Sequence, residues 1–171
     1  MRFYRDAGPG WRPAFCRRRP ALRLTALIFV LGMLGAPAGA QPPLPAIALE
    51  VGGHTVRAEL ADTPGRMRDG LMDRTHLAAD SGMLFMLGPP DDLYCFWMKN
   101  TLLPLSIAFI DERGRIVSIQ DMQPLSLTPH CPPSAITTAL EMAQGWFART
   151  GIQVGDSVQG IPPMPAAAQP Q

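Results

Sequence analysis

Alternating apolar and polar positions divide much of the chain into short predicted β-strands. In the clearest case, residues 55–61, Val56, Ala58 and Leu60 alternate with polar residues, as in a strand with one face in water. Further strands are predicted at 47–51, 83–87, 93–98, 105–110, 115–122, 136–142 and 157–159. Many short strands separated by turns indicate a mainly β domain, either a sandwich or a partly open barrel.

Residues typical of turns and helices separate these predicted strands. Gly52-Gly53 is typical of a hairpin turn, since glycine accepts positive φ angles, and residues 111–114 predict a second turn. Thr63-Pro64 predicts the start of a short helix that runs towards Leu71. Residues 145–150 predict a single helical turn, and the proline-rich residues 123–133 predict a loop. The domain should therefore contain one or two short helices.

The first 40 residues have the pattern of a secretory signal peptide. Seven arginines precede an apolar run of eleven residues, 24–34, and Ala38-Gly39-Ala40 follows. A membrane anchor is the alternative, but a spanning helix needs about 20 apolar residues. We expect cleavage before Gln41 and a periplasmic or secreted protein that keeps no membrane association. The remaining chain is predicted to comprise a linker (41–45), one domain (46–161) and a disordered tail (162–171).

Removal of the signal peptide changes the charge balance. Residues 41–171 hold seven arginines and one lysine against thirteen acidic residues, so their net charge is 8 − 13 = −5. An acidic domain has no basic face with which to neutralise phosphates. The composition therefore argues against a nucleic-acid partner.

Two cysteines, Cys95 and Cys131, remain in the predicted mature chain. In an oxidising compartment an even pair favours a disulfide, while two independent buried thiols are the alternative. The cysteines form no C-x-x-C pattern, so a catalytic redox role has little support.

The most distinctive stretch is Phe96–Thr101, because Lys99 is the only lysine in the chain and Asn100 is the only asparagine. One hypothesis places Lys99, Asn100 and Thr101 at the rim of a small-molecule pocket, with Trp97 and Phe96 in its apolar wall. The alternative is that Asn100 and Thr101 form a turn and that Lys99 lies in solvent.

Glu141 is the predicted partner of Lys99, because it lies in an apolar run where an unpaired carboxylate would be costly to bury. The alternative is that Glu141 faces water on the outer side of the sheet. No metal-ligand cluster, nucleophile motif or phosphate-binding loop is evident in the sequence, so neither a metal nor a cofactor is expected.

Six motifs in order resemble the DUF192 family, also called UPF0127, over residues 50–158. They are Gly70-Leu71-Met72 with Arg74 and Leu77; Gly82–Phe85; Phe96–Thr101 with Pro104-Leu105; Phe109-Ile110-Asp111 with Gly114; Leu140-Glu141 with Gly145; and Gly151-Ile152 with Gly155-Asp156. The resemblance implies a single jelly-roll-like, incompletely closed barrel and no known activity. The cysteine pair and Gly145-Trp146-Phe147 are similar to an exported proteobacterial branch of that family.

Three functional hypotheses follow. The favoured one is an exported binding or accessory domain whose partner is a small molecule or a protein of unknown identity. The second is an enzyme that uses Lys99 and Glu141 as an acid–base pair, and the third is a structural or partner-binding domain. Proximity of Lys99 and Glu141 in a cleft would separate the second hypothesis from the others.

Overall fold

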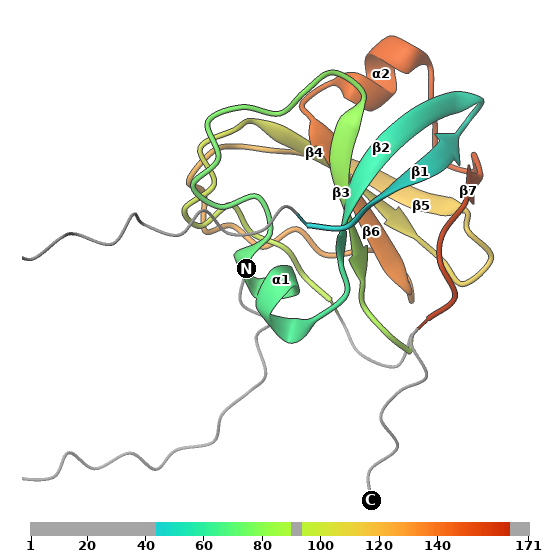
Figure 1. Cartoon of the computed structure of the whole chain (residues 1–171), viewed down its shortest axis with the longest axis horizontal. Helices are drawn as coiled ribbons and strands as arrows, with labels where there is room; N and C mark the ends of the chain where they lie inside the picture. Colours follow the sequence, from blue (N-terminus) through green and yellow to red (C-terminus); the bar gives the residue numbers. More distant parts are fainter. Residues whose placement is uncertain (1–43, 90–93, 165–171) are drawn as a thin grey trace, which may run out of the picture. The chain divides into compact units, whose positions relative to one another are not determined.

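The computed structural model describes residues 44–89 and 94–164 (Figure 1). The predicted signal peptide (1–40), most of the predicted linker and most of the predicted tail lie outside the described residues. Within the described ranges, no helix is both long and apolar enough to cross a membrane.

In these two ranges a single sheet of seven strands forms the domain, in the order β5-β4-β6-β3-β2-β1-β7 (Figure 1). The strands are β1 Ala46–Val51, β2 His54–Ala61, β3 Ser81–Met86, β4 Leu105–Ile110, β5 Ile116–Met122, β6 Thr138–Ala143 and β7 Val158–Gln159. Two short helices, α1 Pro64–Asp69 and α2 Trp146–Thr150, complete the regular structure of the described residues. The predicted mainly β fold is confirmed.

The sheet curls so that its two ends meet. Arg115, just before β5, forms an isolated bridge with Ser157, just before β7. The Val158 N–H also donates to the Gly114 carbonyl at 2.8 Å. All neighbouring strands are antiparallel except β2 and β3, which are parallel and are connected through α1 and the loop after it. The result is a partly closed barrel.

Alternation along the strands produces two apolar clusters, one on each face of the sheet. The inner cluster includes Ile116 of β5 and Val158 of β7, from opposite ends of the sheet. The outer cluster lies against β3, β4 and β6 and is covered by irregular segments. It contains Ala61, Leu71, Met83, Phe85, Leu87, Phe96, Met98, Leu105, Ile107, Phe109, Met122, Ile136 and Ala139.

The β1–β2 turn and the cap of α1 form where the local sequence predicted them. Gly52 and Gly53 have φ angles of +54° and +86° in the β1–β2 hairpin. The Thr63 hydroxyl accepts a hydrogen bond from the Arg66 N–H at 3.3 Å, which caps α1. The helix ends at Asp69, because Gly70 leaves the helical conformation with a φ of +49°.

The predicted strand at 93–98 is wrong for its described part. Residues 94–98 are irregular except for Phe96, which forms an isolated bridge with His130 through hydrogen bonds of 2.8 and 2.7 Å. The alternation that suggested a strand is real, since Phe96 and Met98 are buried and Lys99 is exposed. It arises because the segment covers the outer cluster rather than joining the sheet.

The Cys95–Cys131 disulfide is present, as expected, and closes a sequence separation of 36 residues. It stands next to the Phe96–His130 bridge. The Gln120 side chain donates to the Cys131 carbonyl at 2.9 Å and lies 3.1 Å from His130 Nδ1. These contacts attach the loop of residues 123–133 both to β5 and to the covering segment.

Candidate functional site

Residues Met98–Thr101 form a tight turn at the end of the covering segment. The Thr101 N–H donates to the Met98 carbonyl at 3.0 Å, and Asn100 has a φ of +55°. Asparagine tolerates this left-handed conformation better than most residues. The Asn100 carbonyl accepts a hydrogen bond from the Asp73 N–H at 2.8 Å. The turn therefore holds the loop that follows α1.

The residues predicted to rim a pocket do not come together in the structure. Lys99 is exposed, with its Nζ 5.8 Å from the centroid of the half-buried Trp97 ring, and Asn100 is exposed. Thr101 is buried and Glu141 is completely buried. The predicted Lys99–Glu141 pair does not form, because neither carboxyl oxygen of Glu141 has a hydrogen-bond partner within the described chain. The acid–base pair that the enzyme hypothesis requires is thus missing from the described residues.

Glu141 occupies the centre of the outer face of the sheet. Its partners in register are Met83 on β3 and Ile107 on β4, so apolar side chains flank it on both sides. Burial raises the pKa of the Glu141 carboxyl to about 8. The group is therefore mostly protonated at neutral pH, because its charged form would lose its hydration without gaining a hydrogen-bond partner among the described residues.

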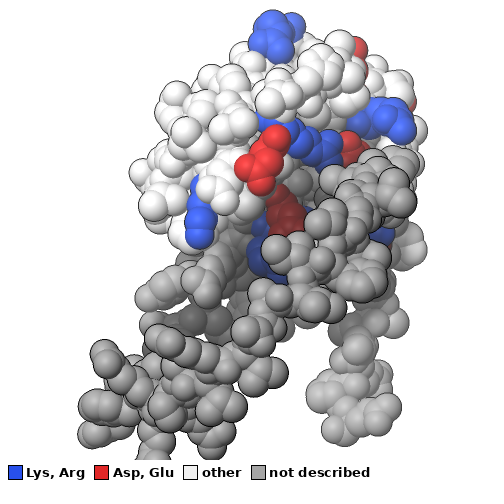
Figure 2. All heavy atoms as spheres, turned by 60° about the vertical axis from the view of Figure 1, so that its left-hand side comes forward, with Lys and Arg blue, Asp and Glu red and all other residues white. Residues whose placement is uncertain are grey.

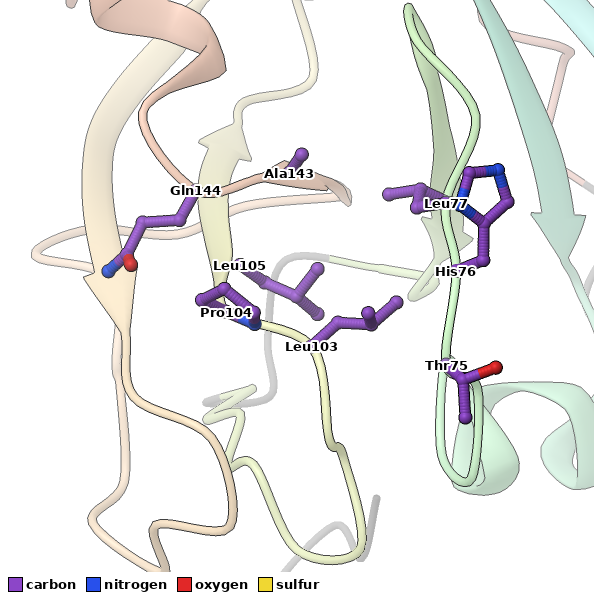
Figure 3. Close-up of a pocket in the computed structure, with 8 residues that line it drawn as sticks. All are labelled: Thr75, His76, Leu77, Leu103, Pro104, Leu105, Ala143 and Gln144. Atoms are coloured by element: carbon purple, nitrogen blue, oxygen red, sulfur yellow. The ribbon is translucent and has the colours of Figure 1, made fainter.

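A pocket of about 370 Å³ opens on the same face of the sheet (Figure 3). Its lining residues are Thr75, His76, Leu77, Leu103, Pro104, Leu105, Ala143 and Gln144. Figure 3 shows Leu77 and Leu103 extending towards each other from two loop segments, with Leu105 and Ala143 contributed by the sheet. The lining of the pocket is therefore mainly apolar, with polar groups from Thr75, His76 and Gln144.

An ion pair anchors one wall of this pocket. Arg74 makes two hydrogen bonds to Glu59 of β2, of 2.5 and 2.6 Å, and both side chains are partly buried. The bidentate geometry fixes orientation as well as distance. Because Arg74 immediately precedes Thr75, this contact and the Asp73–Asn100 hydrogen bond position the loop that carries Thr75, His76 and Leu77.

Sequence reasoning did not select the residues that line the pocket. The pocket combines a loop after α1 with residues 103–105 and the end of β6, and no local pattern links these segments. Leu77, Pro104 and Leu105 did stand within the motifs singled out in the sequence. The nearest sequence signal was thus the motif Phe96–Thr101 with Pro104-Leu105, which contributes Pro104 and Leu105 to the lining.

Exposed leucines lie beside the Met98–Thr101 turn. Leu102, Leu125 and Leu127 are 47%, 58% and 61% exposed, and the Leu125 N–H donates to the Thr101 carbonyl. Leu125 has a φ of +61°, an uncommon conformation for leucine. On the face shown in Figure 2, charged side chains are scattered and most of the described surface is uncharged.

Comparisons with known proteins place the chain in a family. Residues 47–160 match the family model DUF192, described as "Uncharacterized ACR, COG1430", and the chain belongs to this family. No match was found among proteins with curated descriptions.

Two solved structures resemble the chain over most of the domain. A protein of unknown function from Novosphingobium aromaticivorans is 35% identical, with a TM-score of 0.65, and the match covers 75% of this chain and 99% of the other. A protein described as a "putative transcription regulator" from Sinorhizobium meliloti is 31% identical, with a TM-score of 0.67, over 70% of this chain and 97% of the other. These structures support the fold but assign no ligand.

Proposed function

We propose that the protein is an exported domain that binds a small, largely apolar molecule in the pocket between Thr75–Leu77 and Leu103–Leu105. The observation that carries the proposal is the apolar pocket itself, in which the loop wall of Thr75–Leu77 is held by the Asp73 N–H donating to the Asn100 carbonyl and by Arg74 donating to Glu59. In this proposal Asn100 and Thr101 shape the site by forming the turn, whereas Lys99 and Trp97 lie beside it.

We propose no role on nucleic acid, although the Sinorhizobium meliloti protein is described as a "putative transcription regulator". Residues 41–171 have a net charge of −5, and DNA binding draws much of its affinity from cationic side chains.

Binding can be tested with two small probes of nearly the same shape, isovaleramide and 4-methyl-2-pentanone. We expect at least one to shift the methyl NMR signals of Leu105 and Ala143, with a Kd on the order of millimolar for so few atoms. Ala143→Leu should fill the pocket and weaken that binding at least tenfold. Ala48→Leu is the matched control, because Ala48 is exposed on β1. Unchanged methyl signals with both probes would contradict the proposed pocket.

Export is tested separately. The disulfide supports an oxidising compartment, where such bonds persist. When the full chain is expressed in a Gram-negative host, mass spectrometry of periplasmic protein should show a mature chain that begins at Gln41. An intact Met1 terminus would refute the predicted cleavage.

A further inference from the structure

Among the described residues, Glu141 is a buried acidic side chain that the fold leaves unexplained. It is 0% exposed, and neither of its carboxyl oxygens has a hydrogen-bond partner within the described residues. Each of the acids involved in ion pairs in the described chain (Glu59, Asp62 and Asp69) retains some exposure to solvent. A methionine or leucine would satisfy this apolar site better, because a buried polar group without a partner opposes folding. Such a local conflict is expected where a residue serves function rather than stability.

The register of the sheet places Glu141 next to the pocket. Leu105 of β4 pairs with Ala143 of β6, and both line the pocket. The next pair on the same face is Ile107 with Glu141. Residues two apart on a strand are separated by roughly 7 Å and point to the same side. The Glu141 carboxyl therefore lies on the same face of the sheet as the floor of the pocket, one residue pair further into the domain.

Short side chains flank Glu141 along this face of β6. Ala139 and Ala143 flank Glu141 at the positions that share its side of the strand. The cover above them comes from loop segments, including Leu77 and Leu103, rather than from another sheet. A ligand therefore needs to displace only side chains of the covering loops to reach the carboxyl, and not the strands.

We propose that Glu141 is the inner recognition group of this pocket and that the ligand carries a single primary amide or carboxylic acid on a small apolar body. A neutral carboxyl has one donor and one acceptor, and an amide or acid presents the complementary pair in one plane. Two hydrogen bonds would then satisfy both oxygens of Glu141 at once. This inference rests on the proposed function of the pocket and adds the chemical class of its ligand.

The two probes already named differ at one group, since 4-methyl-2-pentanone has a methyl group where isovaleramide has its NH₂. Both have the same isobutyl body and the same carbonyl oxygen. We expect the intact protein to bind isovaleramide at least tenfold more tightly than the ketone, measured from the methyl signals of Leu105 and Ala143. The amide NH₂ supplies the donor that the ketone lacks.

Variants at Glu141 complete the test. Glu141→Gln keeps one donor and one acceptor and should retain isovaleramide affinity within threefold. Glu141→Met removes both and should weaken isovaleramide at least tenfold, and the ketone by less, because the ketone carbonyl can accept only the one hydrogen bond that the carboxyl donates. If Glu141→Met fails to fold, the role of Glu141 is tested by the relative affinities of the two probes for the intact protein.

The outcomes separate the two proposals. Equal affinities for the amide and the ketone on the intact protein, or unchanged isovaleramide affinity in Glu141→Met, would overturn the role of Glu141 and leave the pocket intact. Binding of neither probe would overturn both proposals.

Discussion

Replacing Cys131 with serine is expected to lower the free energy of unfolding by roughly 4 kcal/mol, the loss predicted by the chain-entropy model for a loop of this length. The disulfide joins the covering segment, through Cys95, to the loop of residues 123–133. Without it, the unfolded chain gains the freedom of a 36-residue loop. The melting temperature should fall on the order of 15 °C for a domain of this size.

Urea unfolding of the parent and its variants checks this expectation. Cys95→Ser should match Cys131→Ser, and the double substitution should cost little more, because all three remove one bond. Ser134→Ala, just beyond the same loop, is the control, since Ser134 is exposed. Loss of less than about 0.5 kcal/mol in Cys131→Ser, a typical surface effect, would contradict a stabilising disulfide.

The second large effect is a dependence of stability on pH that arises from Glu141. The native carboxyl has its pKa raised from 4.5 to about 8, because burial penalises the charged form. In the unfolded chain the group returns to its ordinary pKa. Between these two values the native state binds one proton more than the unfolded state, so stability falls as pH rises. The contribution is fully present below pH 4.5 and is lost as pH rises towards 8.

The expected slope is about −1.4 kcal/mol of unfolding free energy per pH unit from this group alone. Glu141→Gln removes the titration but keeps the shape and the polarity. The difference in unfolding free energy between Glu141→Gln and the parent should grow from near zero at pH 4.5 to several kcal/mol at pH 8. Contributions that the two proteins share cancel in that difference. Urea unfolding at intervals of one pH unit measures it, and parallel curves for the two proteins would show that Glu141 does not retain its proton in the fold.

These two expectations bear differently on function. The disulfide stabilises the cover of the outer face, whereas Glu141 weakens the fold at neutral pH. A stabilised Glu141→Gln or Glu141→Met variant would show that the native residue is not optimal for folding. That result would strengthen the case that Glu141 serves the pocket, because stability alone would favour its replacement.

Local sequence patterns determined most of the regular structure. The strands at 46–51, 54–61, 105–110 and 116–122 lie within one or two residues of their predicted bounds, because alternation and glycine turns act over a few residues. The cap at Thr63 and the end of α2 at Gly151 were likewise predictable. The disulfide followed from the number of cysteines and the expected compartment.

Tertiary structure decided the site, because its parts are far apart in the sequence. Phe96 and Met98 alternate like a strand, yet they cover the sheet, because Phe96 is the only residue of 94–98 that forms a β-bridge, and its partner is His130 in a loop. Lys99 was singled out by its rarity, but composition carries no information on burial, and the residue lies in solvent. Glu141 was expected to find a partner, since isolated buried carboxyls are costly, and only the register of β6 with β3 and β4 revealed that both its neighbours are apolar. The pocket depends on the approach of the 75–77 loop to residues 103–105, a contact set by long-range packing that no local pattern encodes.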